Sequence, residues 1–244
     1  MMLEVKNLQK IYPAFTLHDV TFSLPAGTVT GLVGRNGAGK STTLKSILGL
    51  VHPDGGEVRF CGEDVRVNEK AFKEQIGVVL GGIDFYPKKK VKTITEVTRK
   101  FYVNWNEDAY RRYLSLFNID ENKRVEQLSS GMRVKYLIAL ALSHGAKLLI
   151  LDEPTSGLDP VSRDELTELF CALVAEGERS ILFSTHITSD LERCAHNIVY
   201  IKDGTVVQSG SLQEFMSTNA DKGNTLQDII VAMERREWDV SAFV

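Results

Sequence analysis

The sequence predicts an α/β protein with a mixed β-sheet, an N-terminal antiparallel β part and an inserted α-helical subdomain. Residues 28–33 read as a short strand that enters a glycine-rich loop and then a helix with apolar side chains along one face. Residues 147–151 form a near-continuous apolar run, which is typical of a parallel strand buried on both faces. Residues 84–147 instead show helical periodicity, so we expect one helical insertion in the α/β core.

The composition is that of an ordinary globular protein. The 244 residues suffice for one α/β unit with a small additional lobe, and 29 Lys and Arg against 32 Asp and Glu give a net charge of −3. We expect no nucleic-acid partner, because such proteins usually carry an excess of basic residues. Three widely spaced cysteines fit no disulfide framework or metal motif and indicate reduced thiols. No signal peptide or membrane-spanning run is apparent, so we expect a chain that is soluble when expressed alone.

The loop at residues 34–41 matches the phosphate-binding pattern G-x-x-x-x-G-K-[ST] completely. Its glycines let backbone N–H groups converge on phosphate oxygens, and the following helix adds the positive end of its dipole. Lys40 would reach the β- and γ-phosphates, and the Ser41 hydroxyl would ligate Mg²⁺. A glycine-rich turn with an incidental lysine would not account for the flanking strand and helix. We therefore predict a P-loop NTPase core that binds a nucleoside triphosphate and Mg²⁺ through Gly34, Asn36, Gly37, Ala38, Gly39, Lys40, Ser41 and Thr42.

Two acids end the second apolar strand. A buried carboxylate is costly unless a cation compensates it, so Asp152 is predicted to hold Mg²⁺ through water, together with Ser41. Glu153 is predicted to be the general base that orients or deprotonates the attacking water. The two acids could instead simply cap the loop before Pro154, but beside a phosphate-binding loop the catalytic interpretation is favoured.

Further motifs distinguish this chain from other P-loop NTPases. Residues 128–132, Leu-Ser-Ser-Gly-Met before a helix, resemble the L-S-G-G-Q signature of ABC-type ATPases, and residues 156–159 resemble their D-loop. A histidine after a strand resembles their switch histidine, and an aromatic residue stands where they stack a ring on adenine. The resemblance covers residues 1 to about 210, with five motifs in order. The residues that it adds to the predicted site are Tyr12, Ser129, Ser130, Gly131, Asp159 and His186.

Each of these residues has a plainer interpretation when taken alone. Ser129, Ser130 and Asp159 could cap helices, His186 could be a satisfied core or loop histidine, and Tyr12 could pack in the core. Their joint order favours the functional interpretation of the set.

The resemblance implies an ATPase that forms a head-to-tail dimer around two ATP molecules. Each site would join the P-loop of one copy to the signature segment of a second copy or of a paralogue. A separate transmembrane permease subunit is implied, with this chain on the cytoplasmic face of the cell membrane. The signature variants, the short tail and the Trp105 segment resemble bacterial exporter ATPases, which implies export of peptides, antibiotics or other amphipathic compounds. The alternative is a soluble ABC-type ATPase or nucleotide sensor that acts on ribosomes or nucleic acid.

The same resemblance implies domain limits, and the sequence departs from the family's pattern at two places. It implies an ATPase domain at 1–210, with a RecA-like core at about 1–83 and 148–210, a helical subdomain at about 84–147 and a short helical tail at 211–244. The family's glutamine after the strand at 76–80 is missing, because that position falls near Gly81. Ser130 and Met132 stand where Gly and Gln are usual in the signature. We therefore expect modest basal ATPase activity that rises with the proper partner.

Local signals place some helix boundaries. Thr93 and Glu96 form a possible capping box, Asn106 is expected to cap the next helix, and Asp159 with Pro160 forms an N-cap followed by a first-turn proline. The inward face of the first of these helices is predicted to carry Ile94, Val97 and Phe101. The aromatic residues of the helical region, which either dock a membrane subunit or form its own core, are Phe85, Tyr86, Trp105 and Tyr110.

Overall fold

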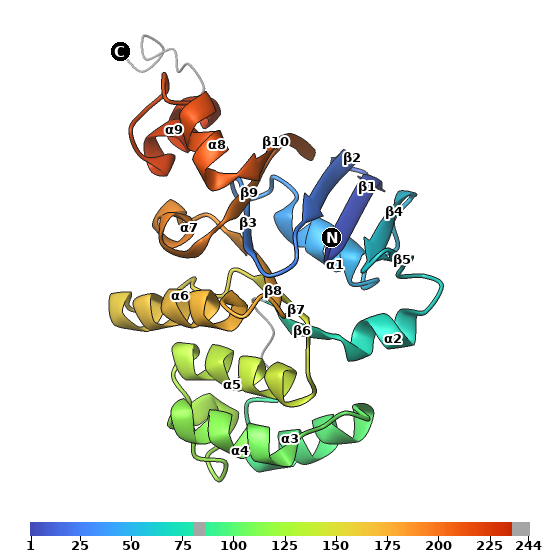
Figure 1. Ribbon diagram of the computed structural model, residues 1–244, viewed down its shortest axis with the longest axis vertical. Helices are drawn as coiled ribbons and strands as arrows, with labels where there is room; N and C mark the ends of the chain where they lie inside the picture. The colour runs from blue at the N-terminus through green and yellow to red at the C-terminus, as the bar shows by residue number, and fades with distance from the viewer. Residues whose placement is uncertain (81–85, 236–244) are drawn as a thin grey trace.

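The computed structural model describes residues 1–80 and 86–235, and it contains the predicted mixed sheet (Figure 1). Six strands lie in the order β10-β9-β3-β8-β7-β6, and all adjacent pairs are parallel except β9 and β10. The central strands β3, β7 and β8 are buried along their whole length, as parallel strands covered on both faces should be. The bounds are β3 Val29–Val33, β6 Ile76–Val79, β7 Leu148–Asp152, β8 Ser180–Thr185, β9 Asn197–Lys202 and β10 Thr205–Ser211.

A second, antiparallel sheet confirms the predicted N-terminal β part. Its order is β2-β1-β4-β5, with bounds β1 Leu3–Tyr12, β2 Phe15–Leu24, β4 Gly55–Phe60 and β5 Glu63–Asp64. In β1 the pairing shifts between Val5 and Leu8, where Asn7 has a φ of 49°. This irregularity lets both Val5 and Leu8 point into the core despite their odd spacing. The β1–β2 hairpin pairs Tyr12 with Phe15 at its tip.

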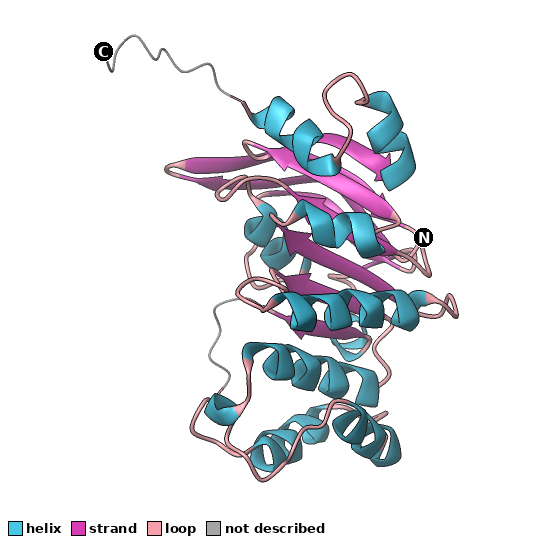
Figure 2. Cartoon of the chain, turned by 90° about the vertical axis from the view of Figure 1, so that its left-hand side faces the viewer, coloured by secondary structure: helices cyan, strands magenta, loops and turns pink. Residues whose placement is uncertain are grey.

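Helices cover the two faces of the six-stranded sheet differently (Figure 2). Helix α1 (Lys40–Ile47) lies between the two sheets, where its Leu44 and Ile47 join a core shared by both. The opposite face is covered by α5 (Ser130–Ser143), α6 (Pro160–Val174), α7 (Thr188–Cys194), α8 (Leu212–Thr218) and α9 (Leu226–Glu234). The P-loop and both acids therefore lie on a sheet whose two faces are both packed.

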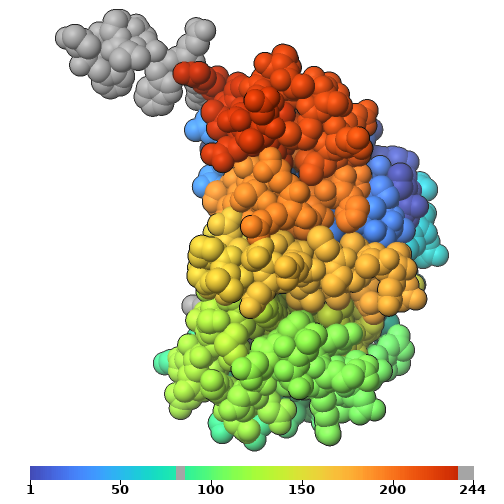
Figure 3. All heavy atoms as spheres, turned by 60° about the vertical axis from the view of Figure 1, so that its left-hand side comes forward, coloured from blue at the N-terminus to red at the C-terminus, as the bar shows by residue number. Residues whose placement is uncertain are grey.

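The predicted helical region has a core of its own and forms one end of the molecule, opposite the tail helices (Figure 3). Hydroxyl groups meet at its centre: Thr95 Oγ1 lies 2.7 Å from Tyr110 Oη and 2.9 Å from Tyr136 Oη. These buried polar groups satisfy one another, and burial raises the pKa of Tyr110 to about 12. The other elements here are α3 (Val91–Thr98), α4 (Glu107–Leu116) and the short 3₁₀ turns η1 (Arg99–Phe101) and η2 (Val125–Gln127), whereas α2 (Glu69–Glu74) packs through Phe72 into the core shared by the two sheets.

Helix α5 belongs to both cores. Its Ile138 and Leu142 pack toward the six-stranded sheet, whereas Tyr136 and Leu140 pack into the helical region. The proposed limit of the helical subdomain at residue 147 therefore stays a prediction.

Two local predictions were wrong. Helix α3 begins at Val91, so Thr93 and Glu96 lie inside the helix and cannot form a capping box. The reason is tertiary: Lys90 pairs with Arg124 in an isolated bridge, which keeps the backbone extended until the residue before the helix.

The predicted inward face of α3 was also only partly correct. Ile94 is buried, but Val97 is 53% exposed within α3, and Phe101, which lies in the 3₁₀ turn after Thr98, is 73% exposed. Other boundaries are confirmed. Asn106 Oδ1 accepts the backbone N–H of Ala109 at 2.9 Å, and Asp159 caps α6. Helix α8 was not predicted, because its seven residues are too few to show a clear helical period.

The aromatic residues of the helical region divide between core and surface. Tyr110 is buried, with its ring centroid 5.3 Å from that of Trp105, whereas Tyr86 is 65% exposed. Gly81 and Phe85 lie outside the described residues. Within residues 1–80 and 86–235, none of the helices combines the length and apolar character needed to cross a bilayer.

A buried histidine makes the stability of this fold depend on pH. His144 is 4% exposed and its ring stacks on Tyr102 with centroids 3.7 Å apart. Burial lowers the pKa of His144 from 6.5 to about 4. Between these two values the unfolded chain binds a proton that the folded chain does not. The free energy of unfolding should therefore fall with falling pH across this window, by about 3 kcal/mol in total.

Chemical denaturation at several pH values between 4 and 7 checks this prediction. His144→Phe keeps an aromatic ring to stack on Tyr102 but has no titrating group, so its stability should depend less on pH than that of the wild type. Identical slopes in the two proteins would contradict the assignment.

Candidate active site

The P-loop connects β3 to α1 with the backbone geometry that phosphate binding requires. Gly39 precedes the first helical residue with a φ of 112°, and no side chain caps α1 there. The N–H groups at this helix end are therefore available to an anion. A Cβ at Gly39 would lie 2.6 Å from Leu17 Cδ2, and one at Gly34 would lie 2.2 Å from the Ile201 carbonyl oxygen. Packing therefore favours glycine at both positions, and the positive φ favours it at Gly39 as well.

Lys40 lies across this loop and is 5% exposed. Its Nζ donates to the Gly34 carbonyl at 2.8 Å and to the Arg35 carbonyl at 3.2 Å. The same atom lies 3.4 Å from Glu153 Oε1. A buried ammonium group is thus held between the phosphate-binding loop and the predicted general base.

Asp152 is the last residue of β7 and is 6% exposed. Its Oδ1 accepts hydrogen bonds from Ser41 Oγ at 3.1 Å and from Ser184 Oγ at 2.5 Å. The carboxylate and the Ser41 hydroxyl are hard oxygen ligands side by side, which suits Mg²⁺. Among the described residues no three His, Cys, Asp or Glu side chains form a metal cluster. Mg²⁺ does not need one, since it is usually held by one or two protein groups with phosphates and water.

Glu153 follows in a strained conformation, with a φ of 50°. Its backbone N–H donates to Ser184 Oγ at 2.9 Å, and this contact holds the turn in place. Its side chain lies between two groups: Oε1 faces Lys40, and Oε2 is 2.8 Å from His186 Nδ1. Ser184 therefore positions both acids, a role that sequence reasoning missed because only the fold places β8 beside β7.

Two hollows meet at the P-loop. The larger, about 630 Å³, is lined by half of the predicted residues, and the smaller, about 420 Å³, contains Tyr12 and Asp203. They share Ala14, Phe15 and Gly37, so the predicted adenine-stacking ring lies next to the phosphate site but in the adjoining hollow. The lining of the larger hollow is Ala14, Phe15, Arg35, Asn36, Gly37, Gly39, Lys40, Ser41, Thr42, Glu153, Ser156 and His186. Sequence reasoning missed Phe15, which no motif marks, and Ser156, which begins the D-loop motif but was not named as a site residue.

The remaining predicted residues do not join this site. Ser129, Ser130 and Gly131 form the start of α5, and Asp159 precedes α6; none of the four lines either hollow. Ser129 Oγ accepts the N–H of Met132 at 3.2 Å, which confirms the capping interpretation.

Asp159 also acts as a helix cap. Its Oδ1 accepts the N–H groups of Val161 and Ser162, and these bonds, with that from the Ser162 hydroxyl, lower the pKa of Asp159. The structure thus divides the predicted residues between two surfaces of one chain.

Residues 17–156 match the family model described as ABC transporter. The chain belongs to the ABC transporter family. It is 34% identical over 215 residues to Nod factor export ATP-binding protein I of Burkholderia orbicola, which covers 86% of this chain and 70% of that protein. It is 31% identical over 210 residues to the bacitracin transport ATP-binding protein BcrA of Bacillus licheniformis, covering 85% and 69%.

A solved structure supports the same assignment. The structure of an ATP-binding subunit of an ABC transporter is 30% identical, with a TM-score of 0.85, and covers 96% of this chain and 100% of that one. The predicted family, fold class and enzyme class, an ABC-type ATPase, are therefore confirmed. The roles of the individual site residues stay predictions.

Removing the Ser184 hydroxyl should impair this ABC ATPase without unfolding it. Ser184→Ala leaves Asp152 and the Glu153 turn without their shared contact, so we expect turnover to fall by about tenfold or more. Steady-state ATPase assays check this. Ser180→Ala is the matched control, since Ser180 is also fully buried in β8 but binds Gly27 and Pro25 away from the P-loop. Equal turnover in the two variants would contradict the role given to Ser184.

Proposed function

We propose that this chain hydrolyses ATP as a dimer and powers a membrane exporter. The observation that best supports the proposal is the meeting of Lys40, Asp152, Glu153 and His186 at one phosphate-binding loop. The loop N–H groups and Lys40 would hold the phosphates, with Tyr12 beside the base. Ser41 and Asp152 would hold Mg²⁺, whose charge stabilises negative charge that develops on the phosphates.

Hydrolysis would depend on the groups around Glu153. Its carboxylate would accept a proton from the attacking water, and His186 would keep it oriented through the 2.8 Å contact. Lys40 Nζ, 3.4 Å from Glu153 Oε1, would hold this carboxylate beside the phosphates.

A second copy would complete each site. Ser129, Ser130, Gly131 and Asp159 lie on a different surface from the P-loop, although their motifs belong to nucleotide binding. Ser130 begins a 14-residue helix, whose N-terminal N–H groups suit a phosphate presented from outside. A head-to-tail arrangement of two copies, or of one copy with a paralogue, would bring the two surfaces together.

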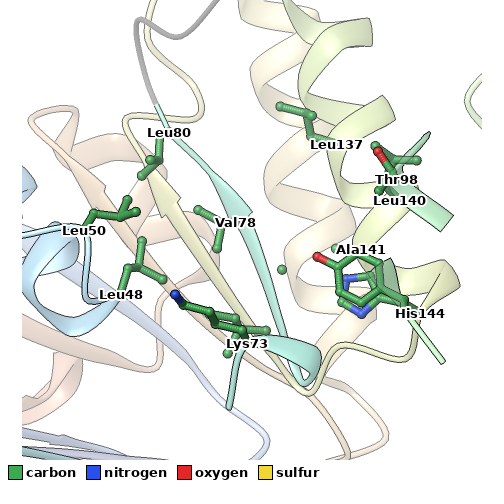
Figure 4. A pocket seen from close by; sticks show the side chains of 13 residues that line it. Leu48, Leu50, Lys73, Val78, Leu80, Thr98, Leu137, Leu140, Ala141 and His144 are labelled. Atoms are coloured by element: carbon green, nitrogen blue, oxygen red, sulfur yellow. The ribbon is translucent and has the colours of Figure 1, made fainter. Parts of the chain in front are cut away.

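A transmembrane permease subunit would dock at an apolar hollow between the sheet and the helical region (Figure 4). This hollow has a volume of about 460 Å³ and lies between β6, α1 and α5. Its wall includes Leu80, which directly precedes the segment at Gly81. Leu50 at its rim is 58% exposed, as expected of a surface that a partner covers.

The same arrangement would place the chain on the cytoplasmic face of the membrane. The names of the relatives, Nod factor export and bacitracin transport, support export of peptides, antibiotics or other amphipathic compounds. The net charge of −3 and these relatives favour transport over action on ribosomes or nucleic acid.

Glu153→Gln tests the enzymatic proposal. The amide cannot accept the proton, so turnover should fall by about a hundredfold or more. ATP binding should persist, and the uncleaved nucleotide should favour a dimer, measured by light scattering after gel filtration. Lys40→Met is the matched control, which should lose both ATP binding and the dimer. Unchanged turnover in Glu153→Gln would exclude Glu153 as the base.

Leu50→Glu tests the docking surface. When the chain is purified from its native membranes, an integral membrane protein should accompany the wild type and be reduced in this variant, because a charge would have to be buried. Leu116→Glu is the control, since Leu116 is 72% exposed on α4 and does not line the hollow. Equal recovery with both variants would place the docking surface elsewhere.

A further inference from the structure

Two helices begin next to the two surfaces that carry predicted nucleotide-binding residues. One surface contains the Asp159 turn, and the other contains the P-loop with His186. Helix α6 begins directly after Asp159, and α7 begins two residues after His186. The helices pack against each other along the same face of the sheet. A movement of one helix would therefore move the other helix, together with the functional residue next to its N-terminus.

An ion pair joins these helices one turn from their starts; it is called the buried pair after its aspartate, while its arginine side chain is 27% exposed. Arg163 Nη2 donates to Asp190 Oδ1 at 2.8 Å, and Asp190 is 2% exposed. The same nitrogen lies 3.4 Å from Ser189 Oγ. A second pair, between Arg193 and Asp164, also connects α7 to α6, but both of its side chains are more than half exposed. Water screens the second pair, so the buried pair is the stronger link.

The buried pair is only half formed. Arg163 Nε and Asp190 Oδ2 are both buried, and neither has a hydrogen-bond partner among the described residues. Buried polar atoms in folded proteins are nearly always paired. A guanidinium group can offer Nε and one Nη together to the two oxygens of a carboxylate, and a small movement between α6 and α7 would create that second bond. That movement would give the interface a second arrangement, joined by two bonds in place of one.

We propose that the Arg163–Asp190 pair is a positioning pair that transmits contact at Asp159 to His186. The inference rests on the proposed function, in which a second copy of the chain contacts the Asp159 turn. That contact shifts the start of α6, the pair closes to two bonds, and α7 moves with its His186 relative to Glu153. The pair thereby makes the orientation of Glu153 depend on the partner copy.

The fold of α7 does not depend on this pair. Leu191 is fully buried and packs on Gly31 of β3, where a Cβ would lie 1.9 Å from its Cδ2. Glu192 Oε1 accepts the N–H of Leu226 at the start of α9, at 2.6 Å. Helix α7 therefore stays attached to the sheet and to the tail when the pair is replaced.

Replacement of the pair by apolar residues of similar size is the test. Arg163→Met with Asp190→Leu removes the link without leaving a buried charge, and such replacements are often neutral for stability. We expect the unfolding midpoint, the KM for ATP and the ATP-bound dimer in a Glu153→Gln background to be retained. We expect kcat to fall by about tenfold or more, because His186 is no longer positioned.

The exposed pair provides the control. Arg193→Met with Asp164→Leu removes the second link between the same helices and should leave kcat unchanged. Arg163→Lys keeps the positive charge and one bond but loses the fork. Arg163→Lys should reduce kcat as the double variant does. If Arg163 served only to place a positive charge there, lysine would restore wild-type kcat. If the double variant does not fold, the kcat of Arg163→Lys alone tests the proposal.

The proposal is overturned if kcat is the same in the buried-pair and exposed-pair variants, or if Arg163→Lys has wild-type kcat. A wild-type protein that neither hydrolyses ATP nor dimerises would instead overturn the proposed function itself.

Discussion

The candidate active site depends on one carboxylate oxygen. Asp152 Oδ1 accepts Ser41 Oγ from α1 and Ser184 Oγ from β8, so it joins the P-loop helix to the ends of two neighbouring strands. Ser184 also receives the backbone N–H of Glu153 and thereby holds that residue in its positive-φ conformation. These contacts fix the proposed general base, the proposed metal ligands and the phosphate-binding loop relative to one another.

The predicted site residues of one chain lie on two surfaces. Lys40, Glu153 and His186 are already in contact within one copy. In the proposed dimer, the start of α5 and the Asp159 turn would contribute to the nucleotide held by the partner copy, so a single chain would be poorly suited to uncontrolled hydrolysis. ATP bound between two copies would thus act both as substrate and as part of the interface, and its hydrolysis would weaken that interface. A transporter can use such a cycle, because association and dissociation are then tied to one chemical step.

Communication inside the chain requires elements that touch both functional surfaces. Helix α5 contacts the sheet with one side and the helical region with the other, beside the apolar hollow proposed for the permease. Helices α6 and α7 connect the Asp159 turn with His186 through a buried pair that has unused hydrogen-bonding capacity. Tightly packed helices transmit movement as small rigid-body shifts, since their side chains cannot be compressed.

The sequence by itself determined the P-loop, the acidic pair and the family, because these motifs specify local backbone geometry: glycines at 34 and 39, the strand before Asp152, and the Asp159 cap all act within a few residues. Only the tertiary structure decided which residues meet. Ser184 reaches Asp152 across adjacent strands, Lys90 starts α3 because it pairs with Arg124, and Arg163 finds Asp190 between two packed helices. Such contacts join residues about 30 positions apart, and no local pattern records them because hydrogen bonds and packing depend on distance in space.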